Sequence, residues 1–126
     1  MQNRIEKAKN IKLLILDVDG VLTDGKLFFD EQGREYKSFN ARDGLGIKLL
    51  QKAGIQVAVI SGRASKPVVL RMEMLGIDLV YLGQTDKGQA FKEIIAKVGC
   101  TPDQAAHVGD DLIDLPVLLQ VGLAIA

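Results

Sequence analysis

The sequence predicts an α/β fold, a three-layer sandwich in which a central parallel sheet lies between two layers of helices. Two observations lead to this class. Short apolar runs bounded by turn residues recur along the chain, and segments whose apolar residues have helical spacing lie between them. Strands that alternate with helices in this way form parallel sheets covered on both faces. A length of 126 residues predicts one domain, residues 1–126, with a hydrophobic core of its own.

Five segments are predicted to be strands of this sheet. Three apolar runs are typical of buried strands, and two shorter runs in the last quarter of the chain add two more. The predicted strands span residues 12–16, 56–60, 78–82, 105–108 and 122–125.

Four helices are predicted between and after these strands. Asp43 is the expected N-cap of the first, and Gly54, Gly76 and Gly99 are the expected stops of the first three. The apolar residues that indicate the helices are Leu45, Leu49, Leu50 and Ala53, then Val68, Val69, Met72 and Leu75, then Ala90, Phe91, Ile94, Ile95 and Val98, and finally Leu112, Leu115, Leu118 and Leu119.

One segment interrupts the alternation of strands and helices. Residues 27–29 and 35–39 flank a polar turn at residues 30–34, which predicts a β-hairpin inserted at about residues 25–39. The first arm has three apolar side chains in a row, so it does not alternate between core and water. Two interpretations are open: the hairpin packs against another subunit, or it folds back on its own domain.

Composition excludes several classes of function. Lys plus Arg and Asp plus Glu both number 16, so net charge gives no reason to expect nucleic acid or an anionic membrane as a partner. The sequence has no apolar run long enough for a transmembrane helix, and its charged N-terminus lacks an apolar signal core. The one cysteine, Cys100, is interpreted as structural and fits a reducing, cytoplasmic location.

Carboxylates follow two of the predicted strands. Asp17 and Asp19 follow the first strand, and alternate residues of an extended chain point the same way. Asp110 and Asp111 follow the fourth strand, with Asp114 one helical turn later. The carboxyl ends of parallel strands meet at one edge of the sheet, and oxygen-rich sites suit Mg²⁺. Taken alone, Asp17 and Asp19 are better explained as an aspartate-rich turn, but the second acidic group after another strand favours the metal site.

Polar residues at two further strand ends are candidates for binding an anion. Ser61 and Gly62 lie where a strand is expected to turn into a helix, so a hydroxyl and main-chain amides could bind phosphate there. Lys87 begins a predicted helix after the third strand and could offset phosphate charge. His107 lies within the fourth strand and is interpreted as a packed residue, neither base nor ligand.

These residues together resemble the haloacid dehalogenase superfamily of phosphatases. The match consists of DVDGVLTDG, Ser61, Lys87 and GDDLIDLP, each at the end of its expected strand. A closer resemblance is to the 3-deoxy-D-manno-octulosonate 8-phosphate (KDO 8-phosphate) phosphatases, on DVDGVLTDGKLFF, KSFNARDGLGIKLL, VISGRAS, Arg71 and LGI. It covers residues 11–126 and implies a Rossmann-like fold of haloacid dehalogenase type without a cap domain.

The resemblance implies a role for each matching residue. Asp17 is the expected nucleophile, and Asp19 the expected general acid and base whose main-chain carbonyl also binds the metal. Asp110 is the second metal carboxylate, so the implied Mg²⁺ ligands are these three aspartates. The implied phosphate-binding residues are Ser61, Gly62 and Lys87, while the supporting residues Asp111 and Asp114 orient Lys87 or metal-bound water.

The resemblance also implies a substrate and an assembly. The expected reaction is hydrolysis of KDO 8-phosphate in lipopolysaccharide precursor synthesis, through an aspartyl-phosphate. Arg42, Arg63 and Arg71 are candidates for binding the carboxylate of the sugar acid, because a guanidinium matches a carboxylate bidentately. Family members are homotetramers in which the hairpin and the chain end of one subunit close the site of the next. The family continues past the last predicted strand in a glycine-rich tail, whereas this sequence ends at Ala126, which bears on substrate closure but removes no phosphoryl-transfer residue.

Other functions stay open at the level of sequence. A phosphatase for nine-carbon, sialic-type sugar acids would share much of this pattern. A phospho-accepting regulatory domain without turnover, such as a bacterial receiver, would also combine acids, a hydroxyl and a lysine. Receivers carry the accepting aspartate on a middle strand and lack an acid two residues later, so Asp17 and Asp19 favour the phosphatase. A domain retained for assembly alone is the remaining alternative.

Overall fold

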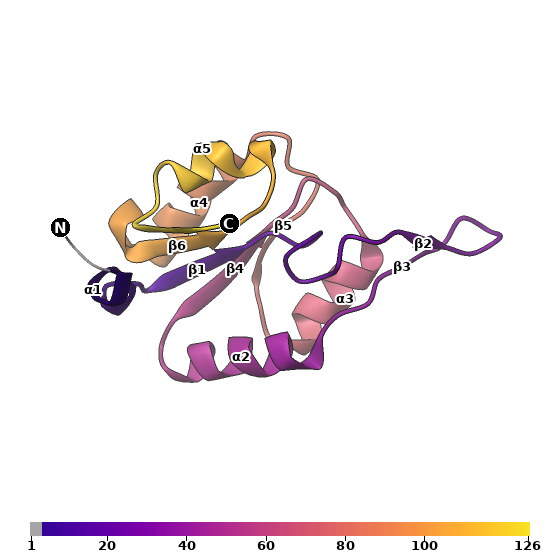
Figure 1. Ribbon diagram of the computed structural model, residues 1–126, viewed down its shortest axis with the longest axis horizontal. Helices are drawn as coiled ribbons and strands as arrows, with labels where there is room; N and C mark the ends of the chain where they lie inside the picture. Colours follow the sequence, from indigo (N-terminus) through magenta and orange to yellow (C-terminus); the bar gives the residue numbers. More distant parts are fainter. Residues whose placement is uncertain (1–3) are drawn as a thin grey trace.

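The computed structural model describes residues 4–126 and contains one parallel sheet of five strands (Figure 1). The order across the sheet is β5-β4-β1-β6-β7, so the first strand of the chain is the central one. All strand pairings in this sheet are parallel, which confirms the predicted fold class. The strands are β1 (Leu13–Leu16), β4 (Gln56–Ile60), β5 (Leu79–Tyr81), β6 (Ala105–Val108) and β7 (Leu123–Ile125).

Helices cover both faces of the sheet, and each face has its own apolar cluster. Figure 1 shows α2 (Ala41–Lys52) and α3 (Lys66–Met74) on one face, and α4 (Lys87–Val98) and α5 (Leu115–Leu118) on the other. Successive strand residues point to opposite faces. Leu13 and Ile15 of β1 therefore belong to the cluster under α4, and Leu16 belongs to the cluster under α2 and α3.

Two short elements near the ends of the sheet strands were not predicted. The N-terminal helix α1 (Arg4–Lys9) has no buried residue, so it lacks the apolar periodicity that would indicate a helix. The single turn η1 (Pro102–Gln104) precedes β6 and is capped by Thr101. Among residues 4–126, the structure contains no helix with the length and apolar character needed to cross a membrane.

The first core helix, α2, begins earlier than predicted and turns a different face to the sheet. Its N-cap is Asn40, not Asp43, and the Asn40 side chain accepts a hydrogen bond from the main-chain N–H of Arg42. Leu45 and Leu49 are 62% and 58% exposed. The buried residues are Gly44 and Ile47. Gly44 faces α3 so closely that a Cβ atom there would lie 2.5 Å from Arg71 Nη2, which explains why a glycine takes part in the packing.

The last predicted helix is a tight turn followed by a short helix. Residues Leu112–Asp114 form the 3₁₀ turn η2, and α5 has only four residues. Leu112 and Leu119, which were predicted to share an apolar face, are 82% and 77% exposed. The helical spacing of the leucines predicted the wrong buried face. The residue of η2 that points into the protein is Asp114, a polar residue that is completely buried.

The hairpin extends away from the sheet (Figure 1). Its strands β2 (Phe28–Phe29) and β3 (Glu35–Tyr36) pair antiparallel, over a shorter length than the predicted arms at residues 27–29 and 35–39. Phe28 and Phe29 are 47% and 58% exposed, so the first arm is not buried against the core of its own domain. That they pack against another subunit stays a prediction.

Candidate active site

A pocket lies at the edge of the sheet where β1, β4 and β6 end. Its volume is about 600 Å³. In open parallel sheets this edge is the usual place for a ligand site, because several loops converge there. Eight of the residues predicted from sequence line it: Asp17, Asp19, Ser61, Gly62, Arg63, Lys87, Asp110 and Asp111.

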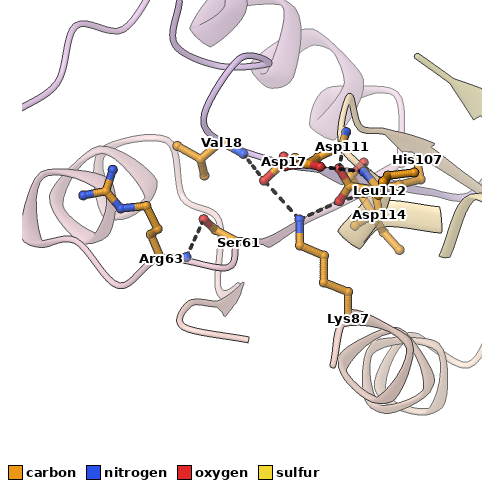
Figure 2. A network of polar contacts seen from close by, with 10 residues as sticks. Asp17, Val18, Ser61, Arg63, Lys87, His107, Asp111, Leu112 and Asp114 are labelled. Carbon is orange, nitrogen blue, oxygen red and sulfur yellow. Dashed lines mark hydrogen bonds and ion pairs between the residues drawn. The ribbon is translucent and has the colours of Figure 1, made fainter. Parts of the chain in front are cut away.

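The centre of the pocket is a buried lysine between two aspartates (Figure 2). Lys87 begins α4, as predicted, and its side chain is 1% exposed. Its Nζ lies 2.5 Å from Asp114 Oδ1 and 3.3 Å from Asp17 Oδ1. Charges are removed from water only at a cost, and a buried cation therefore needs such partners. Asp114 thus orients Lys87, which is one of the supporting roles expected for it.

Burial and charge act in opposite directions on the two aspartates. Burial raises the pKa of Asp17, and neither the nearby Lys87 nor the hydrogen bond from the Val18 N–H fully offsets that effect. Burial also acts to raise the pKa of Asp114, but the hydrogen bond and charge of Lys87 outweigh it and leave this pKa below its ordinary value. Asp114 is therefore stabilised as the carboxylate anion, whereas the environment of Asp17 disfavours its charged form.

Three carboxylates are arranged so that they could hold one metal ion. Oxygen atoms of Asp17, Asp110 and Asp114 all lie within 4.8 Å of one another. Asp110 can approach the loop after β1 because Gly20 has no side chain: a Cβ atom there would lie 2.2 Å from Asp110 Oδ2. Gly20 also has a positive φ of 83°, which favours glycine. An all-oxygen donor set of this kind fits a hard cation such as Mg²⁺.

The structure separates the carboxylates of Asp17 and Asp19. The chain turns sharply after Val18, whose carbonyl accepts hydrogen bonds from the N–H groups of Val21, Leu22 and Thr23. The Asp19 carboxylate lies outside the three-carboxylate group and binds Lys37 Nζ at 2.7 Å. Metal binding by Asp19 was expected through its main-chain carbonyl, and that role stays a prediction.

Ser61 and Gly62 line the pocket but do not begin a helix. Ser61 directly follows β4, and its main-chain N–H donates to the carbonyl of Tyr81 at 2.9 Å. The helix α3 begins only at Lys66, after the N-cap Ser65, so the expected anion site at a helix N-terminus is wrong for this pair. The Ser61 hydroxyl accepts a hydrogen bond from the Arg63 N–H at 3.3 Å, which leaves its own proton available to a ligand.

The second arm of the hairpin brings two charged residues that the sequence analysis missed into contact with side chains that line the pocket. Lys37 has a side chain only 2% exposed and contacts both Asp19 and Glu35. Glu35 in turn binds Arg63 Nη2 at 3.0 Å. Because Glu35 and Lys37 are two residues apart, strand alternation places them on the same side of the arm. Alternation in the predicted second arm could indicate that the two share a side, but it could not indicate that Lys37, which lies past the end of β3, reaches Asp19.

His107 is a fully buried residue of β6, as predicted, but it also contacts the site (Figure 2). Its Nδ1 donates to the carbonyl of Ile15 at 3.0 Å, and its Nε2 lies 3.4 Å from Asp114 Oδ1. His107 thereby contacts Asp114, and both side chains are completely buried. Asp111 caps η2, accepting from the Leu112 N–H, and its own N–H donates to Asp114 Oδ2 at 3.3 Å.

The three arginines proposed from sequence occupy different places. Arg63 lines the pocket and is about half exposed. Arg42 is exposed at the start of α2 and does not line the pocket. Arg71 belongs to α3, and its side chain lies against Gly44 of α2, with its guanidinium carbon 5.9 Å from the centre of the Phe39 ring. The fold therefore brings only Arg63 to the strand-end site, and substrate contacts by Arg42 and Arg71 stay predictions.

Comparison with known proteins finds a family and close relatives. Residues 40–122 match the model of the haloacid dehalogenase-like hydrolase family. The 3-deoxy-D-manno-octulosonate 8-phosphate phosphatase KdsC of Yersinia pestis is 51% identical over 122 residues, covering 97% of this chain and 65% of the relative. The chain thus spans a little less than two thirds of the length of that curated relative.

Solved structures give the same result. The crystal structure of the Yersinia pestis 3-deoxy-D-manno-octulosonate 8-phosphate phosphatase matches with a TM-score of 0.94 at 51% identity, covering 95% of this chain and 65% of that one. The enzyme of the same name from Moraxella catarrhalis, solved with magnesium, phosphate and KDO, matches with a TM-score of 0.89 at 42% identity. That match covers 93% of this chain and 67% of the other.

Proposed function

This chain belongs to the haloacid dehalogenase-like hydrolase family, and on that premise we propose that it hydrolyses KDO 8-phosphate to the free sugar acid and phosphate. The observation that carries the proposal is the grouping of a nucleophilic aspartate, a buried lysine and a second acid in one pocket, as Asp17, Lys87 and Asp110. The relatives named above support the choice of substrate, since they are named as KDO 8-phosphate phosphatases.

Asp17 is the proposed nucleophile of the reaction. One of its carboxylate oxygens attacks phosphorus as the bond from phosphorus to the sugar oxygen breaks, which gives an aspartyl-phosphate. Lys87 lies 3.3 Å from Asp17 Oδ1, so its charge is placed beside the phosphoryl group during transfer. Ser61 and Gly62 line the same pocket and supply a hydroxyl and a main-chain N–H for the remaining oxygens.

Mg²⁺ is the proposed cofactor, and the donors fit it. Asp17 and Asp110 would hold the ion with carboxylate oxygens, and Asp19 with its main-chain carbonyl. When bound, Mg²⁺ neutralises charge on the phosphate and on the nucleophile. Asp114 belongs to the same group of carboxylates but binds Lys87, so we assign it to lysine orientation and to water near the metal.

Asp19 is the proposed general acid and base. Its proton passes to the sugar oxygen as that oxygen leaves, because an alkoxide is a poor leaving group. The resulting carboxylate then takes a proton from the water that cleaves the aspartyl-phosphate, which restores Asp17 and releases phosphate. A side chain 29% exposed at the pocket rim is suited to exchange protons with substrate and water.

The surroundings of this reaction are also proposals. The substrate class places the protein in lipopolysaccharide precursor synthesis, in the cytoplasm. The exposed side chains of Phe28 and Phe29 support assembly, which we propose to be a homotetramer. Arg63 is the proposed contact for the sugar carboxylate, because it alone of the three candidate arginines lines the pocket.

A phosphate-release assay over a panel of sugar-acid phosphates, with Mg²⁺ present, tests the proposed function. We expect the highest kcat/KM with KDO 8-phosphate and a lower value with nine-carbon sugar-acid phosphates. The Asp17→Asn protein is the control for contaminating phosphatase. A preference for a nine-carbon substrate would overturn the sugar assignment, and a phosphorylated protein that persists for minutes without release would favour a regulatory domain.

A further inference from the structure

We propose that Lys37 is a positioning residue that holds the carboxylate of Asp19 in place for proton transfer. The inference rests on the proposed function, because it assigns to Asp19 the role of general acid and base. It concerns a residue of the hairpin arm, which lies outside the four strand-end segments that carry the other site residues.

The contact between Lys37 and Asp19 is a close ion pair in a protected place. Lys37 Nζ lies 2.7 Å from Asp19 Oδ1, and the Lys37 side chain is 2% exposed. A lysine ammonium is strongly hydrated, so it is buried only where anions replace its water. Lys37 has two such anions, but Glu35 is the more distant of them, at 3.5 Å. The short contact is therefore the one to Asp19.

In the described part of the chain, the Asp19 carboxylate has one orienting partner, which is Lys37. Among residues 4–126, no other group makes a hydrogen bond or ion pair to the Asp19 carboxylate. Its Oδ2 is thus left without a protein partner, in a residue that lines the pocket. With Oδ1 held by Lys37, Oδ2 is the oxygen that would carry the proton, so the protonated carboxyl group would meet the leaving oxygen in a single orientation.

Lys37 is itself fixed by a chain of alternating charges. Glu35 contacts Lys37 and also binds Arg63 Nη2 at 3.0 Å, and Arg63 follows the Ser61–Gly62 segment at the end of β4. The chain of contacts therefore joins the loop after β1, the hairpin arm and the loop after β4. Each member has an oppositely charged neighbour, so the ammonium of Lys37 has little freedom to follow Asp19 if the carboxylate rotates.

The chemistry explains why orientation matters at Asp19. Proton transfer to a leaving oxygen requires the acid within hydrogen-bond reach in the transition state. A misplacement of about 1 Å can cost on the order of a hundredfold in rate. Lys37 neither gives nor takes the transferred proton, so its effect is confined to steps in which Asp19 acts.

Two substrates with different leaving groups can show whether Lys37 positions Asp19 or only stabilises the fold. A sugar phosphate needs a proton on its leaving oxygen, whereas nitrophenolate leaves from p-nitrophenyl phosphate without one. In Lys37→Met, which keeps the apolar stem and loses the ammonium, kcat/KM for KDO 8-phosphate should fall by about ten- to a hundredfold. The kcat/KM for p-nitrophenyl phosphate should change little, and Lys37→Arg should restore part of the loss.

Arg34→Met is the matched control, because it removes another hairpin ion pair, with Asp30, that has no contact with Asp19. It should behave as the wild type with both substrates, and thermal melts should show all three variants folded. Equal losses on the two substrates, or no loss on either, would overturn the role of Lys37. A wild-type protein that hydrolyses neither substrate with Mg²⁺ would instead contradict the proposed function.

Discussion

Asp17 combines two requirements that conflict at the scale of a single residue. The proposed attack on phosphorus needs the carboxylate anion, yet burial raises the pKa of Asp17 despite the nearby Lys87. A carboxyl whose pKa is higher in the folded than in the unfolded chain favours folding at low pH, and this contribution is lost as pH rises through the folded pKa. At neutral pH, charged Asp17 therefore destabilises the metal-free fold.

Asp17→Asn tests both consequences. Turnover should fall by on the order of 10⁴-fold or more, the usual size of the loss when a nucleophile is removed. The melting temperature of the metal-free protein at neutral pH should rise, because Asn removes the costly charge and can still accept the hydrogen bond from the Val18 N–H. Calorimetry with chelator present measures the second effect, and the gain should shrink towards acid pH. Retained phosphate release would refute the assignment of the nucleophile.

Lys87 should matter to stability as much as to catalysis. In Lys87→Met, Asp114 would keep its buried charge without the cation 2.5 Å away. Breaking one partner of a buried pair costs about 3–5 kcal/mol, so chemical denaturation should show a loss of that size in the free energy of unfolding.

Two further variants test whether the uncompensated charge of Asp114 causes this loss of stability. Lys92→Met removes an exposed lysine of the same helix and should leave the stability unchanged. Adding Asp114→Asn to Lys87→Met should recover part of the loss, since it removes the uncompensated charge. A double variant less stable than Lys87→Met alone would contradict the buried-charge explanation.

Sequence reasoning reached the site residues that follow strands and missed those that do not. Asp17, Asp110 and Lys87 could be predicted together, because each comes at the end of a strand or the start of the next helix, and parallel strands share one edge. Lys37 belongs to an irregular segment after β3, and its contact with Asp19 crosses eighteen positions. Nothing in local periodicity fixes where such a segment returns to the sheet.

At the scale of elements, the existence of helices could be predicted better than their orientation. The helix α2 was expected from its leucines, but Leu45 and Leu49 face solvent and Ile47 faces the sheet. Helical spacing is compatible with either face when apolar residues are found all around a helix. The face of α2 that packs on the protein is the one that carries Gly44, which lies close to Arg71 of α3. This is a contact between segments distant in the sequence.

The hairpin provides the prediction at this scale. Replacing Phe28 and Phe29 with Ser should weaken the proposed tetramer, because burying one Phe side chain contributes roughly 1.5–3 kcal/mol. Sedimentation velocity at micromolar concentration should show smaller species. The KM for the sugar phosphate should rise if a neighbouring subunit closes the site.

Leu49→Ser is the matched control, since Leu49 on α2 is as exposed as Phe29, at 58% for both. It should leave the assembly intact if the hairpin carries the interface. A wild-type protein that sediments as a monomer and still turns over its sugar phosphate efficiently would rule out the proposed assembly.

At the scale of the whole molecule, metal binding should couple activity to stability. The pocket brings together carboxylates from residues 17, 110 and 114, so an ion there links the beginning and the end of the sequence. Activity should disappear in excess EDTA and return with Mg²⁺. At a Mg²⁺ concentration of about a hundred times its Kd, the free energy of unfolding should rise by about 2.7 kcal/mol.

Binding should also release protons near the pKa of Asp17, because burial raises that pKa in the metal-free protein and a metal ligand must be deprotonated. Calorimetric titrations in buffers of different ionisation enthalpy measure this release. Undiminished turnover in excess EDTA would contradict the metal requirement. Proton uptake on binding would contradict the assignment of Asp17 as a ligand.

The position of β1 at the centre of the sheet has a consequence for the protein as it is synthesised. One edge of β1 pairs with residues 56–59, but the other waits for residues 105–108. Until β6 leaves the ribosome, β1, which Asp17 directly follows, has an open hydrogen-bonding edge of the kind that can pair with other chains. Asp110 and Asp114 arrive with the same late segment that closes this edge. Closure of this edge and completion of the proposed metal site therefore depend on the same late segment of the chain.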